Sequence, residues 1–197
     1  LIGGVGSDWA SYAGATGGVA VTIDGSGNGS ATGAAGNDSL SGIENILGSS
    51  NNDALTGGSG ANSLLGGAGN DTIVGGGGAD FLSGGLNNDS IVGGTGNETI
   101  DGGDGNDTMV GSIGNDSIIG GTGIDSIDYS GGSGAVIANL ATGIVQDGYG
   151  GTDTVSGLEV ISTGRCTGRP DEPGGETGPA TPPDLLPVTV AEEPRRV

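Results

Sequence analysis

A nine-residue unit repeats nine times in succession between residues 48 and 128, with no insertion. Its consensus is Gly-Gly-x-Gly-Asn-Asp-x-U-x, where U is apolar and usually aliphatic, and the clearest copies read GGAGNDTIV from Gly66 and GGDGNDTMV from Gly102. A unit this short cannot bury a core alone, so a fixed period predicts an architecture in which each unit stacks on its neighbours. The repeat therefore predicts a solenoid.

Each position of the unit suits a tight turn followed by a short strand. Glycine at positions 1, 2 and 4 is predicted to allow positive φ angles. Asparagine, which tolerates the same region, replaces glycine at position 4 in Asn51 and Asn87. Residue U is predicted to begin a short strand and to point into the core. The residues at this position are Leu55, Leu64, Ile73, Leu82, Ile91, Ile100, Met109, Ile118 and Ile127.

Charge is distributed very unevenly along the chain. Lysine and histidine are absent, and all four arginines and all seven prolines lie in the last 33 residues. Residues 1–164 therefore carry 18 of the 24 acidic side chains and no cationic side chain. Such a segment repels nucleic-acid phosphates and anionic membranes, and its oxygen ligands attract Ca²⁺ or Mg²⁺. We expect no nucleic-acid partner and no membrane insertion, since no apolar run approaches the roughly 18 residues of a membrane helix.

The array resembles the RTX (repeats-in-toxin) calcium-binding β-roll. The resemblance implies an all-β, right-handed parallel β-roll in which two repeats make one coil, so that residue i stacks on residue i+18. It also implies that calcium is held between stacked loops by position-6 side chains and loop carbonyls. On that plan one face carries five ligands and the other four. Up to about seven ions then lie between successive ligands, four on the first face and three on the second. The predicted metal ligands are Asp53, Asp71, Asp89, Asp107 and Asp125 on the first face, and Asn62, Asp80, Glu98 and Asp116 on the second. The alternative to metal binding is that each Gly-Asn-Asp loop forms a plain Asx-turn without a metal ion.

Two related modules flank the array, at residues 1–47 and 129–164. Each is predicted to be a longer, irregular coil of the same solenoid, with a strand indicated by alternating apolar residues. Those residues are Val19, Val21 and Ile23 in the first module, and Val136, Ala138 and Leu140 in the second. Trp9, Tyr12 and Tyr129 are expected to pack or to cover an end, whereas Glu44 and Glu159 are expected to accept backbone hydrogen bonds. Metal binding by Asp8, Asp38 and Asp153 stays open.

Residues 165–197 have no repeat, and their proline and charge content predicts a disordered tail. The alternatives are a natural linker and a frameshifted or truncated gene end. The chain begins within a repeat-like sequence, so we expect it to be a fragment of a longer protein.

The resemblance further implies a calcium-driven folding module of a secreted, extracellular bacterial protein, exported unfolded by type I secretion machinery. The alternative is a structural spacer or adhesive segment of a large surface adhesin. We do not expect an enzyme, because the chain has no histidine, no lysine and no HExxH or GxSxG motif. An ice-binding solenoid is disfavoured because position 3 forms no threonine ladder.

Overall fold

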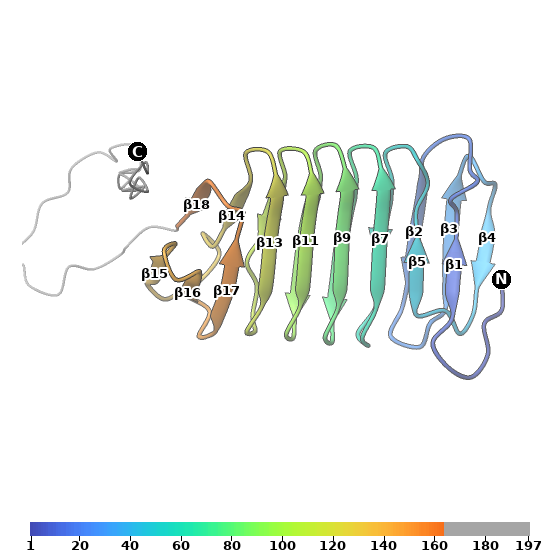
Figure 1. Ribbon diagram of the computed structural model, residues 1–197. Coiled ribbons are helices and arrows are strands. Elements are labelled where there is room, and N and C mark those ends of the chain that lie inside the picture. Colours follow the sequence, from blue (N-terminus) through green and yellow to red (C-terminus); the bar gives the residue numbers. More distant parts are fainter. Residues whose placement is uncertain (164–197) are drawn as a thin grey trace, which may run out of the picture. The chain divides into compact units, whose positions relative to one another are not determined.

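The computed structural model describes residues 1–163, which form a β-solenoid (Figure 1). This part of the chain consists of strands and turns and contains no helix. In particular, it has no helix of the length and hydropathy that crossing a membrane requires. The predicted disordered tail, residues 165–197, lies outside the described residues.

The first of two sheets pairs nine strands in the spatial order β1-β5-β7-β9-β11-β13-β17-β16-β15. In that order the strands are Trp9–Ser11, Asn45–Leu47, Ser63–Ala68, Phe81–Leu86, Thr99–Asp104, Ser117–Thr122, Thr152–Ser156, Ile144–Asp147 and Val136–Asn139.

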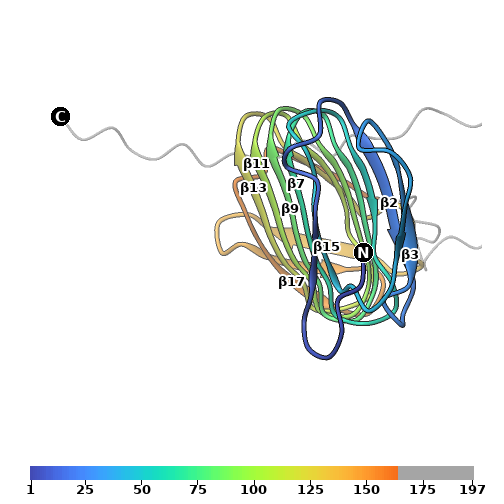
Figure 2. The same ribbon diagram turned by 90° about the vertical axis from the view of Figure 1, so that its right-hand side faces the viewer.

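The second sheet also has nine strands, in the order β18-β14-β12-β10-β8-β6-β2-β3-β4. In that order they are Val160–Ser162, Ser126–Asp128, Thr108–Val110, Ser90–Thr95, Thr72–Gly77, Ala54–Thr56, Val19–Ile23, Gly29–Gly33 and Asp38–Leu40. Within the array the chain alternates between the sheets, so one coil contributes one strand to each. Viewed along the stack, successive coils overlie one another (Figure 2).

The pairing register confirms the coil of two repeats. Strands β8, β10 and β12 are parallel, and Ile91 pairs with Ile73 on one side and with Met109 on the other. Each partner is 18 residues away, so equivalent side chains stack directly above one another. The predicted all-β parallel solenoid is therefore confirmed.

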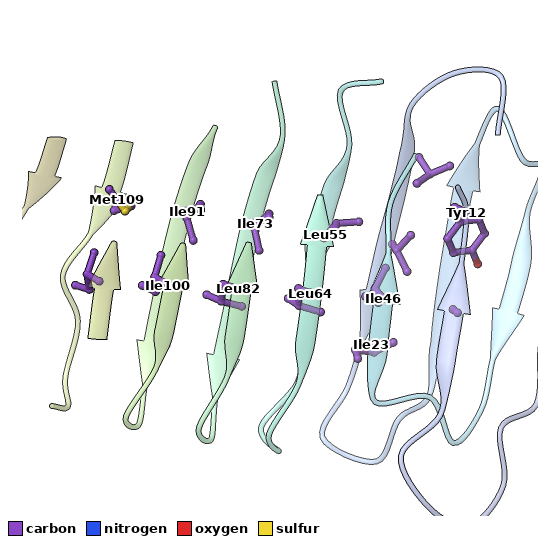
Figure 3. Close-up of a cluster of buried hydrophobic side chains, with 14 of the residues drawn as sticks. Tyr12, Ile23, Ile46, Leu55, Leu64, Ile73, Leu82, Ile91, Ile100 and Met109 are labelled. Atoms are coloured by element: carbon purple, nitrogen blue, oxygen red, sulfur yellow. The ribbon is translucent and has the colours of Figure 1, made fainter. Parts of the chain in front are cut away.

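The core is a double row of the apolar U residues, as Figure 3 shows from Leu55 to Met109. All nine of these side chains, including Ile73 and Leu82, are at most 1 % exposed. The prediction that they point inward is confirmed. With no large aromatic in the array core, the interior is thin, which is why a nine-residue unit suffices to line it.

The glycines serve two different purposes. Those at positions 2 and 4 take positive φ except Gly58 and Gly60; the angle is 114° at Gly85, for example, and Asn87 takes 78° at position 4. The prediction was wrong for position 1, where none of the array's glycines has positive φ, and for Asn51. At position 1 the requirement is space: a Cβ on Gly84 would collide with Oδ2 of Asp89 and lie 2.6 Å from the carbonyl oxygen of Gly102.

Antiparallel strands at both ends of the stack were not predicted. Strands β2, β3 and β4 pair antiparallel at one end, and β15, β16 and β17 do so at the other. The alternation of Val19, Val21 and Ile23 does form β2, with all three side chains buried. The corresponding prediction was wrong for Leu140, which lies outside β15 and is 39 % exposed. β15 is the edge strand, so no further coil covers its side chains.

Candidate metal centres

The nine predicted ligands lie in two columns, one along each row of loops. The first column precedes strands β6, β8, β10, β12 and β14, and the second precedes β7, β9, β11 and β13. Every side chain is buried, from 0 % exposed at Asp125 to 7 % at Asn62. The first column comprises Asp53, Asp71, Asp89, Asp107 and Asp125, and the second Asn62, Asp80, Glu98 and Asp116.

In every column aspartate after Asp53, one carboxylate oxygen has a structural role. Oδ1 of Asp89 accepts a hydrogen bond from the backbone N–H of Asp71 at 2.7 Å, and Oδ1 of Asp107 accepts one from Asp89 at 2.8 Å. In the second column, Oδ1 of Asp116 accepts from the N–H of Glu98 at 2.9 Å. Each bond spans 18 residues, so Oδ1 ties one coil to the preceding one.

The other oxygen of these carboxylates is buried and has no hydrogen-bond partner. This holds for Oδ2 of six aspartates and for both carboxylate oxygens of Glu98. A buried carboxylate oxygen without a donor is costly, and residues 1–164 contain no cationic side chain to offset it. The six aspartates are Asp71, Asp80, Asp89, Asp107, Asp116 and Asp125.

Asp53 and Asn62, at the first coil of the array, differ from the rest. Oδ1 of Asp53 accepts from the N–H of Val19 at 2.7 Å, and both of its oxygens accept from Ser49. Oδ1 of Asn62 accepts from the N–H of Gly58 at 2.9 Å, while Nδ2 donates to the carbonyl oxygen of Glu44 at 2.7 Å. Their polar atoms are therefore engaged by the protein itself.

Burial raises the carboxyl pKa values of six column residues, namely Asp71, Asp80, Asp89, Glu98, Asp107 and Asp116. The pKa of Asp89 rises to about 7, first because the side chain is desolvated and then because Asp71 and Asp107 carry like charge. The pKa of Glu98 rises to about 8, again chiefly through desolvation, with Asp116 the largest charge effect. The columns thus hold negative charge that folding alone makes unfavourable at neutral pH.

The RTX calcium-binding nonapeptide repeat family matches the chain in four overlapping copies, at residues 47–82, 56–91, 92–127 and 110–135. Residues 47–135 belong to the RTX calcium-binding repeats. The array is accordingly a calcium-binding repeat module. No curated protein matches the chain.

The donor set of the RTX array fits calcium. Within residues 1–163, no three acidic, histidine or cysteine side chains converge on one point. A cation beside an unpartnered Oδ2 would therefore take most of its ligands from loop carbonyls. A carbonyl oxygen is among the nearest atoms at seven of the nine position-1 glycines, whereas side chains are nearest at Gly93 and Gly111. Calcium accepts six to eight hard oxygen ligands in flexible geometry, which agrees with carboxylates supplemented by carbonyls.

Asparagine at position 5 has a role in the RTX loops that the sequence analysis missed. Oδ1 of Asn88 accepts from the N–H of Asn106 at 2.8 Å, and Oδ1 of Asn70 accepts from the N–H of Asn88 at 3.1 Å. These bonds run toward the following coil, opposite to those of the position-6 aspartates. The recurrence of asparagine at position 5 was the available signal.

The end modules continue both columns. As predicted, Glu44 and Glu159 accept backbone hydrogen bonds, from Asp8 at 2.9 Å and Asp125 at 2.8 Å. Asp153 takes the place after Asp116 in the second column, and its Oδ1 accepts from the N–H of Asp116 at 2.8 Å.

The aromatic side chains of the end modules differ in burial. Tyr12 and Tyr129 are buried, as predicted for packing residues, while Trp9 on the end strand β1 is 48 % exposed.

Proposed function

We propose that residues 1–163 are a calcium-driven folding module of a secreted bacterial protein. The observation that carries this proposal is the set of buried carboxylate oxygens without partners in a segment that has no cationic side chain. Without calcium these charges oppose folding. With calcium, the free energy of ion binding becomes free energy of folding.

Five positions suit calcium best, because both flanking side chains have an unpartnered oxygen. Three are in the first column and two in the second. The sequence-based plan of seven ions includes two further positions, beside Asp53 and Asn62, where one flanking side chain is already engaged by hydrogen bonds within the protein. We propose weaker binding there. The five favoured pairs are Asp71–Asp89, Asp89–Asp107, Asp107–Asp125, Asp80–Glu98 and Glu98–Asp116.

The cellular setting follows from this dependence on calcium. A chain that does not fold until it meets abundant calcium can pass a type I secretion channel unfolded and fold outside the cell. Membership of the RTX repeats supports this extracellular location. We assign the module no catalytic role, because the chain contains no histidine or lysine that could act as a general base for a hydroxyl nucleophile.

Far-ultraviolet circular dichroism across a calcium titration tests the proposal. We expect little β-structure in EDTA and a cooperative gain with millimolar calcium. Magnesium should substitute poorly, because it demands near-octahedral geometry and holds its water ligands. A spectrum already rich in β-structure in EDTA, and unchanged by calcium, would refute the proposal.

A further inference from the structure

Asp147 is an acidic residue outside both the nonapeptide pattern and the family match, which ends at residue 135. It is the last residue of β16, in the antiparallel end of the first sheet. Its side chain is 0 % exposed. Oδ1 accepts backbone hydrogen bonds from Tyr149, Gly150 and Gly151 at 2.8, 3.0 and 2.9 Å. Oδ2 is buried and has no partner.

The loop after β16 brings Asp147 to the end of the second column. A Cβ on Gly151 would lie 2.6 Å from Oδ2 of Asp147 and would collide with the carbonyl oxygen of Gly114, in the loop that carries Asp116. Asp116 is 3 % exposed and its Oδ2 is likewise unpartnered. The charge of Asp147 also contributes to the raised pKa of Asp116, after the larger effect of burial. Oδ2 of Asp147 therefore lies beside a backbone carbonyl of the loop that carries Asp116, whose own Oδ2 is also unpartnered.

Asp153, which follows Asp116 in the column register, is not available in the same way. Its Oδ1 accepts from the N–H of Asp116, and its Oδ2 accepts from the hydroxyl of Tyr129 at 2.7 Å. Tyr129 is itself 0 % exposed, so this hydroxyl has no competing water. In the last coil, both carboxylate oxygens of Asp153 are thus engaged by hydrogen bonds within the protein. Asp147 supplies the unpartnered oxygen instead.

We propose that Asp147 and Asp116 hold an additional calcium ion at the end of the second column, completed by the carbonyl oxygen of Gly114. The proposal rests on calcium binding by the array and extends it beyond the nonapeptide repeats. A surface pocket beside the site is lined by Gln146, Asp147 and Gly150. Calcium suits the site better than magnesium, because carbonyl and carboxylate oxygens in an irregular loop do not impose octahedral geometry.

Counting bound calcium on the full chain, by equilibrium dialysis with elemental analysis and by native mass spectrometry, tests the proposal. Asp147→Asn keeps Oδ1 for the three loop N–H groups and removes the charge, so it should bind one ion fewer than wild type. Asp153→Asn should bind as many as wild type. The matched control is Asp101→Asn, an equal charge change at a partly exposed strand position outside the columns, which should also leave the count unchanged.

Two results would overturn the proposal: an unchanged count for Asp147→Asn, or loss of the ion in Asp153→Asn alone. If Asp147→Asn does not fold in calcium, the number of calcium ions bound by Asp116→Asn tests the proposal instead. It should lose two ions if the site with Asp147 exists, and only the ion shared with Glu98 if it does not. Wild type that binds no calcium would refute the folding module itself, and calcium bound equally by wild type and Asp147→Asn would refute only the additional site.

Discussion

Replacing Asp89 by asparagine should move two measurable quantities in opposite directions. The side chain lies in the middle of the first column, 3 % exposed. Asparagine preserves Oδ1, which accepts the N–H of Asp71, but removes the charge and replaces the unpartnered Oδ2. The metal-free fold should therefore gain stability, while the calcium-bound fold should lose it.

The magnitudes follow from the raised pKa. The pKa of Asp89 moves from 3.8 to about 7, chiefly through desolvation. At pH 8 the ionised side chain therefore opposes metal-free folding by on the order of 4 kcal/mol, and Asp89→Asn removes this opposition. In calcium the variant loses a charged ligand shared by two ions. Removing one partner of a buried charge interaction costs about 3–5 kcal/mol, so the calcium midpoint of folding should rise.

Circular dichroism at pH 8 measures both effects. In EDTA, the concentration of a stabilising osmolyte such as sucrose needed to induce β-structure should be lower for Asp89→Asn than for wild type. In a calcium titration its midpoint should be higher. Asp101→Asn, on a strand outside the columns, serves as the control and should change neither. A variant that shifts both quantities in the same direction, or neither, would refute the assignment of Oδ1 to structure and Oδ2 to calcium.

Three further outcomes are expected. In EDTA, β-structure should increase as the pH falls from about 8.5 to 5: burial raises the pKa of Asp89 to about 7 and of Glu98 to about 8, so the folded chain binds more protons, and its stability is lost as the pH rises through these values. Circular dichroism that loses β-structure on acidification would contradict this. In urea unfolding with saturating calcium, Ile91→Ala should lose about 2–5 kcal/mol because the side chain is 0 % exposed, and the partly exposed Val92→Ala should lose less. Asp89→Ala should raise the calcium midpoint more than Glu98→Ala, since the latter's column includes the uncharged Asn62; the reverse order would show that the ranking of the columns is wrong.

The repeat alone identified the core and predicted the type of ligand. Ile73 and Ile91 were placed inside from their position after the Asn-Asp pair, because every unit stacks on nearly identical units and meets the same surroundings. Asp89 was predicted to be a ligand for the same reason, and the structure buries it with Oδ2 unpartnered. Asn87 was expected at positive φ because its backbone must follow the path that glycine takes elsewhere. These properties depend on the position of a residue within the nine-residue unit, and the nine copies of the unit make that position unambiguous.

Only the tertiary structure distinguished residues that occupy equivalent positions. Asp53 and Asp89 share a place in the repeat, yet Oδ1 of Asp53 accepts the N–H of Val19 whereas Oδ1 of Asp89 accepts that of the equivalent Asp71, because β2 of the first end module, not another repeat, pairs with β6. Asp147 reaches the end of the second column by way of a strand that turns back along the sheet. The partners of a buried oxygen depend on which element stacks on its loop. That stacking is decided by contacts between distant parts of the chain, so no nine-residue pattern contains it.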